Sequence, residues 1–426
     1  MTVLLQRTKS GGDRLGPLFP DARARGQLLE QAGALVAEGH RLESAGGRLR
    51  AALRPLLRVM NAHHASRIEG QPIQPIDIER ALAHQFDDNP ERAHDQQLAL
   101  THIRAEAALE SALPTKRVGL YAPEFVQCIH AELHRALVGP EPLADTEPPA
   151  APGAWREATL EGLVAHDLPE PEDIPELLEL WQAGYSKPSG LDQAVVGAAC
   201  SQQLLLRVRP FAHGNGRTAR LHTHLVLTAF GLTHGLWSPL RGVARDRDRY
   251  FAELGLAPPE RTDPLADASL PSRAELEAFA SWWIDMCTGE ARFMRELLEP
   301  EGLKSRLNDL LLWLTAHPWV IGSEKSVVKR EALEALHYTA LSGPVERSRF
   351  LAMLGLQHRT ARRVLTSLID FGVLSAESSR SSVSFDVPLA SLRFLFPRLW
   401  PEAEVAQQPS SAPVYAEPTE SRLALE

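Results

Sequence analysis

The residues between 209 and 220 combine glycine and arginine in a pattern that suits anion binding. They read Arg-Pro-Phe-Ala-His-Gly-Asn-Gly-Arg-Thr-Ala-Arg, and a helical run follows them. Gly214 and Gly216 allow successive backbone N–H groups to turn inward as a nest for an anion, and the N-terminal end of the helix adds positive potential. Arg217 and Arg220 stand three residues apart, on one face of the first turn. Two guanidinium groups beside such a nest suit a di- or triphosphate; the alternative is a plain loop-to-helix turn with surface arginines.

This pattern resembles the motif of the Fic (Fido) family, His-x-Phe-x-Asp/Glu-Gly-Asn-Gly-Arg-x-x-Arg. The resemblance covers roughly 65–300, and it places a segment before the family's substrate-docking flap at Gly153-Ala-Trp-Arg156 and the flap itself near 159–169. It implies that the loop binds ATP or a related nucleotide. The matching residues are Phe211, Gly214, Asn215, Gly216, Arg217 and Arg220.

Two positions of the loop depart from the family motif. The histidine that serves the family as general base is Arg209 here, and the acid that holds Mg²⁺ is His213. Arginine has no acceptor and a pKa above ~12, so it cannot take a proton, and a lost general base costs roughly 10²- to 10⁴-fold in rate. The lost acid removes a metal ligand, so neither Mg²⁺ nor another metal is expected. We therefore expect nucleotide binding with impaired AMP transfer to protein; the alternatives are His213 as a displaced base and an active protein adenylyltransferase.

A glutamate upstream suggests how the loop is regulated. Residues 65–70 read Ala-Ser-Arg-Ile-Glu-Gly, which resembles the Ser/Thr-x-x-x-Glu-Gly/Asn motif of Fic proteins with N-terminal inhibition, although Ala65 departs from it. The resemblance implies that Glu69 pairs with Arg220 and occupies the guanidinium that a phosphate would otherwise use. The alternative is a helix that ends at a glycine cap with an exposed glutamate.

Residues 347–387 predict a winged helix-turn-helix. A helix over 347–355 would end at Gly355, and a recognition helix and exit would cover 356–374. Residues 325–386 carry nine Lys/Arg and six Asp/Glu, so their net charge is +3, against −9 for the chain. Local basicity supports DNA contact; the alternatives are dimerisation or protein docking, and a transcription regulator with a helical dimerisation domain. The residues expected to meet the major groove are Arg359, Thr360, Arg362 and Arg363.

The elements around these motifs predict an all-α fold, with a Fic/Fido helical core followed by a small α+β winged-helix domain. Helical patterning runs over 21–60, with Pro55 expected to interrupt it. His130 and His134 are interpreted as helix-surface residues because no acid stands at a useful spacing. The expected divisions are a flexible tail (1–20), an N-terminal helical region (21–110), the Fic/Fido core (111–300), the winged helix (301–400) and a disordered tail (401–426).

The amino-acid composition restricts where the protein is expected to be located and what it is expected to bind. The chain of 426 residues is 44% hydrophobic and contains three separated cysteines, without a CxxC pair. That usage fits a reducing compartment. No apolar run approaches the ~18 residues of a membrane span, and the N-terminus lacks the apolar core of a signal peptide. We expect a cytoplasmic protein whose partners are a nucleotide, DNA at the winged helix, and a protein target or a second copy.

Overall fold

The structure is a computed structural model, and it is predominantly helical. Its only paired strands, within the described residues, are β1 (Leu374–Ser375) and β2 (Ser384–Phe385), which run antiparallel. The fold class is therefore the expected one, all-α with a small C-terminal α+β part. The tail at 401–426, most of the flap at 159–169 and most of the tail at 1–20 lie outside the described residues. The residues described are 16–46, 49–71, 73–113, 117–135, 151–158, 169–255, 270–322 and 326–399.

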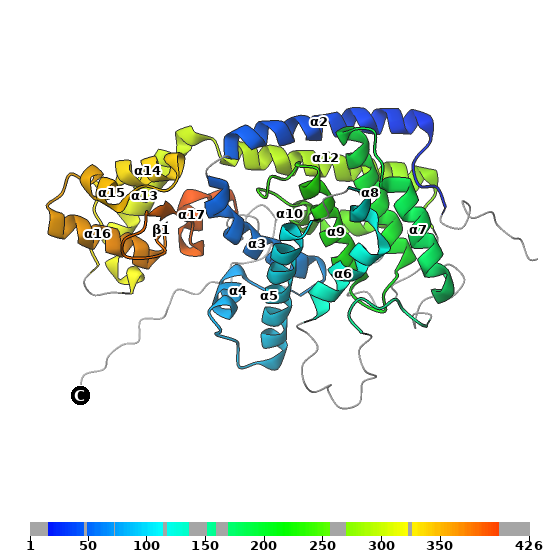
Figure 1. Ribbon diagram of the computed structural model, residues 1–426, viewed down its shortest axis with the longest axis horizontal. Helices are drawn as coiled ribbons and strands as arrows, with labels where there is room; N and C mark the ends of the chain where they lie inside the picture. The colour runs from blue at the N-terminus through cyan, green and yellow to red at the C-terminus, as the bar shows by residue number, and fades with distance from the viewer. Residues whose placement is uncertain are drawn as a thin grey trace, which may run out of the picture.

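The chain divides into a large helical part and a smaller C-terminal part (Figure 1). The α-helices of the large part are α2 (Ala22–Gly46), α3 (Leu49–Ile68), α4 (Pro75–Leu82), α5 (Pro90–Ser111), α6 (Pro123–His134), α7 (Ile174–Tyr185), α8 (Leu191–Val208), α9 (Asn215–Ala229), α10 (Pro239–Arg245), α11 (Arg247–Leu254) and α12 (Arg273–Leu297). Those of the C-terminal part are α13 (Pro300–Ala316), α14 (Ala332–Ser342), α15 (Arg347–Met353), α16 (His358–Phe371) and α17 (Leu392–Leu395). Among the described residues no helix is both long and apolar enough to span a bilayer.

Two long helices, α2 and α12, lie side by side along one edge of the large part (Figure 1). Helix α12 begins with a capping box: Glu275 N–H donates to Ser272 Oγ at 3.2 Å, and Ser272 N–H donates to the Glu275 carboxylate at 2.7 Å. These bonds satisfy backbone groups that a helix start leaves open. Both helices pack against α8, and so they hold the helix that leads into the glycine loop.

Helix α3 runs without interruption through Pro55, so the expected break there is wrong. Proline inside a helix costs about 3 kcal/mol because it removes one hydrogen bond and crowds the preceding turn. Pro55 itself is exposed, whereas Leu53, Leu56 and Leu57 around it are buried. Packing of these leucines offsets the local cost, and α3 therefore carries the chain as one rigid element to Ile68.

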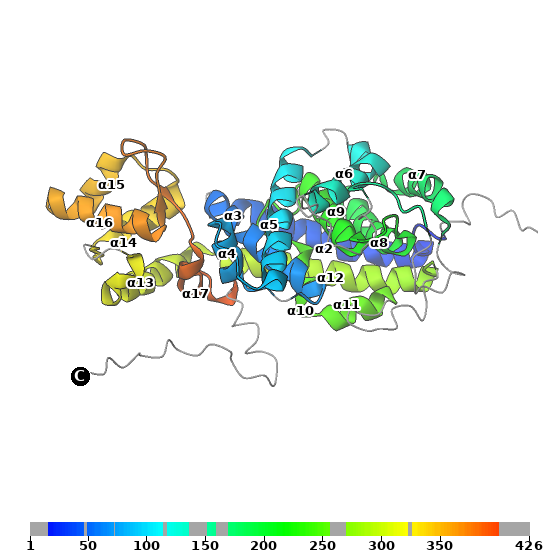
Figure 2. The same cartoon turned by 90° about the horizontal axis from the view of Figure 1, so that it is seen from below.

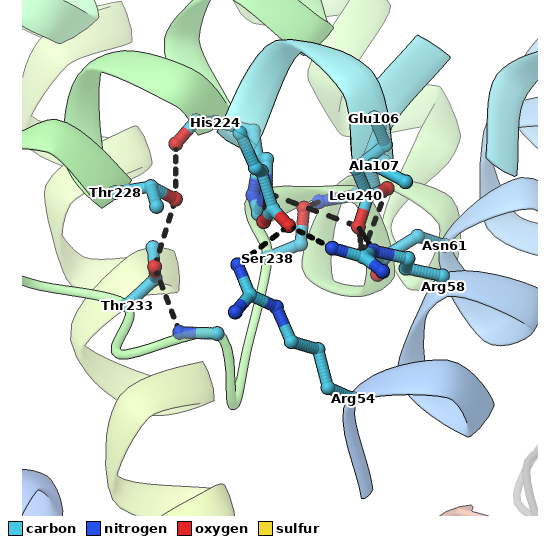
Figure 3. A network of polar contacts seen from close by, with 12 residues as sticks. Arg54, Arg58, Asn61, Glu106, Ala107, His224, Thr228, Thr233, Ser238 and Leu240 are labelled. Atoms are coloured by element: carbon cyan, nitrogen blue, oxygen red, sulfur yellow. Dashed lines mark hydrogen bonds and ion pairs between the residues drawn. The ribbon is translucent and has the colours of Figure 1, made fainter. Parts of the chain in front are cut away.

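A buried network of charged groups joins α3, α5 and α9 (Figure 3). Glu110 accepts from Arg58 Nη2 at 2.5 Å, from Arg54 Nη2 at 2.9 Å and from His224 Nε2 at 3.2 Å. Asn61 Nδ2 donates to Glu106 at 3.0 Å. Sequence periodicity could not predict this network, because the carboxylates stand on one helix and their partners on two others.

Charge balance explains why these groups tolerate burial. Burial by itself would raise the pKa of Glu110, but the bonds from His224, Arg58 and Arg54 outweigh it and lower that pKa to about 2. Burial also opposes charge on His224, yet Glu110 and Glu106 raise its pKa. Glu106, Glu110 and His224 stand close enough to hold a metal ion, but Arg58 and Arg54 already neutralise the carboxylates. Within the network, the arginines and His224 therefore balance the carboxylate charge of Glu110.

The C-terminal part contacts the large part through α4 and α12 (Figure 2). The backbone N–H of Leu389 donates to the Glu79 carboxylate on α4 at 3.3 Å. Arg398 lies 3.7 Å from Glu296 on α12. The two parts therefore meet on the side of the molecule where α4 follows the end of α3.

We expect Glu110→Gln to lower the free energy of unfolding at pH 7 by roughly 3–5 kcal/mol, because it leaves the buried His224, the largely buried Arg58 and the partly exposed Arg54 without the carboxylate charge that balances them. The folded-state pKa of Glu110 is depressed to about 2, so its contribution is present above the unfolded pKa near 4.5 and is lost as the pH falls toward 2. Urea denaturation at pH 7 and at pH 3 measures both effects. Glu132→Gln, at a surface pair with Arg135, is the matched control; equal losses in the two variants would contradict the argument.

Candidate functional site

The glycine loop lies between the end of α8 and the start of α9. Arg209 closes α8 in the left-handed conformation (φ 46°), and Gly214 precedes α9 with φ 70°. A positive φ at Gly214 favours glycine, since a side chain would strain the backbone there. The first N–H groups of α9 are thereby turned toward the loop, as an anion site requires.

Three contacts fix the shape of the loop. Asn215 Oδ1 accepts from Phe211 N–H at 3.0 Å, and Asn215 Nδ2 donates to the Phe211 carbonyl at 2.7 Å. Phe211 is buried between Trp155 and His130. Arg156 Nε donates to the Arg209 carbonyl at 2.9 Å. The loop is therefore held by its own asparagine and by the segment that stands before the expected flap.

The end of α3 reaches this loop through a glycine turn. Gly70 has φ 78°; its N–H donates to the Arg67 carbonyl at 3.1 Å, and Gln71 N–H donates to the Ser66 carbonyl at 3.0 Å. This pair of bonds is the Schellman motif, which satisfies carbonyls that a helix end leaves open. Glu69 and Gln71 consequently stand on either side of Gly70 with their side chains next to α9.

Glu69 contacts the second arginine of the loop. Arg220 Nη2 donates to Glu69 Oε1, and Arg220 is buried while Glu69 is one quarter exposed. An ideal Cβ on Gly216 would lie 3.0 Å from both Glu69 Oε1 and Arg220 Nη1. The carboxylate therefore lies at the glycine nest, and a phosphate bound there would compete with it for Arg220.

Gln71 contacts the first arginine, a contact that the sequence did not predict. Arg217 Nη2 donates to Gln71 Oε1 at 2.7 Å. Burial lowers the pKa of Arg217 to about 10, and Asp95 opposes this shift only in part. A half-buried guanidinium with a neutral amide acceptor gains from an anion more than a paired one does. The turn after α3 thus occupies both arginines of the loop, one with a carboxylate and one with an amide.

The two departures from the family motif lie at the same loop but differ in burial. Arg209 is half-buried, and burial together with the charge of Arg207 lowers its pKa; among the described residues its guanidinium has no acidic partner. His213 is exposed, and its backbone carbonyl lies 3.2 Å from His130 Nε2. Arg209 adds positive charge beside the loop, whereas His213 brings no carboxylate to it.

His130 and His134 are not the surface residues that we expected. His130 is buried and stacks on Phe211 at 3.9 Å, and His134 stacks on His130 at 4.1 Å. Both rings therefore pack beneath the glycine loop. The spacing of the two histidines on α6 could not predict this packing, because its partner, Phe211, is distant in sequence.

The residues expected to meet DNA lie on α16. Arg359, Arg362 and Arg363 are exposed, and Thr360 is half-buried. The opposite side of the helix is buried through Val364, Leu365 and Leu368. The arginines thus gather on the outer face of the C-terminal part.

Comparison with known proteins gives the class of this chain. The model of the Fic/DOC family matches residues 121–227, which include α6, α8, the glycine loop and most of α9. The chain therefore contains a Fic/DOC family domain.

Two solved structures are also similar to the chain. One is a Fic family protein from Desulfovibrio desulfuricans, with 14% identity and a TM-score of 0.49; the match covers 87% of this chain and 98% of that one. The other is a Fic domain containing signaling protein from Bacteroides thetaiotaomicron, with 15% identity and a TM-score of 0.43; the match covers 62% of this chain and 97% of that one.

We expect Gln71→Glu to weaken the binding of pyrophosphate by about tenfold, because a charged hydrogen bond to Arg217 is stronger than a neutral one by about 1.4 kcal/mol. Gln71→Ala should strengthen binding, since it frees Arg217. Titration calorimetry with pyrophosphate measures both constants. Gln74→Glu, at the residue before α4, controls for added negative charge nearby. If both Gln71 variants bind pyrophosphate like the wild type, the contact has no part in anion binding.

Proposed function

We propose that this chain binds a nucleotide, with ATP as the expected one, through its phosphates at the loop of residues 209–220. The contact of Glu69 with Arg220 carries the proposal, because it places a carboxylate on the guanidinium beside the glycine nest. The nest, Arg217 and Arg220 supply N–H donors to phosphate oxygens. Fic/DOC domains cover nucleotide binding and AMP transfer in general, which agrees with this choice.

Glu69 would then regulate the loop. The carboxylate and a terminal phosphate are both anions, so the two compete for one guanidinium. Gln71 adds a second contact from the same turn. In the state described, the site is closed to a phosphate by protein groups, and ligand binding has to displace them.

We further propose that transfer of AMP to a protein hydroxyl is impaired in this chain. Arg209 stands at the family's base position and cannot accept a proton. His213 stands at the position of the metal-binding acid, and Mg²⁺ prefers oxygen ligands. Residues 209–220 contain no carboxylate, and Glu69, the acid that reaches the loop, is paired with Arg220, so this set of residues does not fit Mg²⁺. Impaired transfer leaves nucleotide sensing as the principal role.

We expect Glu69→Gly to bind ATP at least about tenfold more tightly than the wild type, because one charged contact worth ~1.5–3 kcal/mol no longer competes. Titration calorimetry of the two proteins measures this. Glu69→Gln, which keeps the shape of the side chain, should fall between them. Absence of ATP binding in all three proteins would end the proposal.

DNA binding by the C-terminal part is a second candidate function, supported by the exposed arginines of α16. A winged helix presents such a helix to the major groove. Helix α15, the turn at Gly355, α16 and the β1–β2 hairpin follow one another along the chain, which is the order expected of that fold. Coupling of nucleotide binding to DNA would make the protein a regulator.

We expect Arg362→Ala with Arg363→Ala to weaken DNA binding and to reduce its salt dependence by about one to two phosphate contacts. Fluorescence anisotropy with genomic duplex fragments across a series of salt concentrations measures both quantities. Arg92→Ala, an exposed arginine of α5, is the control. DNA binding that is absent, or indifferent to the α16 changes, would leave protein docking as the role of this part.

A further inference from the structure

The ring of His134 lies directly against the glycine loop. An ideal Cβ on Gly214 would stand 2.3 Å from His134 Cε1 and 2.4 Å from His134 Nε2. The space beside Gly214 is therefore filled by the Cε1–Nε2 edge of this imidazole. The family resemblance gave no role to His134, which reaches the loop from α6 rather than from the motif itself.

Hydrogen bonding fixes the tautomer of this ring. His134 Nδ1 lies 2.8 Å from the His130 carbonyl oxygen, and because a carbonyl only accepts, Nδ1 carries the hydrogen. In the neutral ring Nε2 then holds a lone pair. Among the described residues nothing donates a hydrogen bond to this nitrogen. Stacking on His130, whose own Nδ1 accepts from Gly153 N–H at 2.9 Å, holds the ring in place.

The surroundings keep the ring neutral. Burial lowers the pKa of His134, and the charges of Arg217 on α9 and of His213 on the loop lower it further, while the bond to the His130 carbonyl opposes the shift. The neutral form of the imidazole is therefore favoured at neutral pH. A lone pair beside an anion site repels phosphate oxygens, but it accepts a hydrogen bond from a hydroxyl group.

We propose that His134 is the proton acceptor of this loop, and that it serves a hydroxyl, from water or a protein side chain, that attacks the nucleotide. This inference rests on the proposed nucleotide binding. It gives the loop a base from α6 in place of the one lost at Arg209, and it predicts a low rate of turnover rather than none.

The proposed reaction is a nucleophilic substitution at the α-phosphorus of the nucleotide. The hydroxyl O–H bond breaks and its proton passes to His134 Nε2, while the oxygen forms a bond to the α-phosphorus. The bond from that phosphorus to the bridging oxygen of the β-phosphate breaks, and pyrophosphate leaves with the electron pair. The imidazolium then returns its proton to solvent. With water as the nucleophile the products are AMP and pyrophosphate.

Nucleotide binding should also raise the pKa of His134. Phosphates at the loop neutralise Arg217, which in the unliganded protein disfavours a proton on His134. The acid limb of kcat should therefore lie at higher pH than the acid limb of kcat/KM, since the first reports the complex and the second the free enzyme.

The test uses the full chain with Glu69→Gly, and it follows the formation of AMP from labelled ATP. Adding His134→Asn should lower the rate by at least about 100-fold and remove the acid limb, while ATP affinity by calorimetry stays within about threefold. His134→Ala should regain part of the rate when imidazole is added, which a packing role would not allow. His94→Asn, at an exposed histidine of α5, is the matched control.

Three results would overturn the inference. The first is full turnover in the His134→Asn protein, and the second is loss of turnover on His213→Asn with His134→Asn unaffected. The third is tight ATP binding by Glu69→Gly without any AMP or labelled protein, which leaves the proposed nucleotide binding intact. Absence of ATP binding instead overturns the proposed function itself.

Discussion

The contact between the end of α3 and the start of α9 is the interaction on which the site depends. Helix α9 offers N–H groups and guanidiniums, and such a concentration of positive charge at a half-buried loop is unfavourable without an acceptor. The turn at Gly70 supplies one, since Glu69 meets Arg220 and Gln71 meets Arg217. The turn thus places a carboxylate and an amide where the proposed phosphate would bind.

Glu69 and Gln71 differ in charge, and this difference affects the electrostatic potential at the loop. A carboxylate neutralises Arg220, whereas the amide of Gln71 leaves the charge on Arg217 in place. Arg209, half-buried and without an acidic partner among the described residues, adds to the same excess. Positive potential therefore persists at the loop even with Glu69 on Arg220, and it would favour the approach of the polyphosphate proposed to bind there.

The sequence was informative where function depends on residues close together in the chain. The glycine loop, its helix and the helical class followed from local spacing, and the family model agrees at residues 121–227. The pairing of Glu69 with Arg220 came from the resemblance, not from spacing. Other features depended on contacts between distant segments: His130 beneath Phe211, Gln71 on Arg217, and Glu110 between α3 and α9. Periodicity marks which face of a helix is buried but not what it meets, and Pro55 shows that packing overrides a local signal.

The buried network bears on how the site opens. Arg58 and Asn61 of α3 contact carboxylates on α5. These two residues precede Glu69 by eleven and eight positions, or by about 16 and 12 Å along the helix at 1.5 Å per residue. Because α9 joins the same network through His224, the body of α3 is fixed relative to the helix that carries both loop arginines. Under the proposed nucleotide binding, displacement of Glu69 by a phosphate would require a change only in the turn at 69–71, where three backbone hydrogen bonds hold the chain. Under the proposed nucleotide binding, a rigid α3 with a short releasable end would act as a local switch, and His134 on α6 would keep its geometry while a phosphate replaced Glu69.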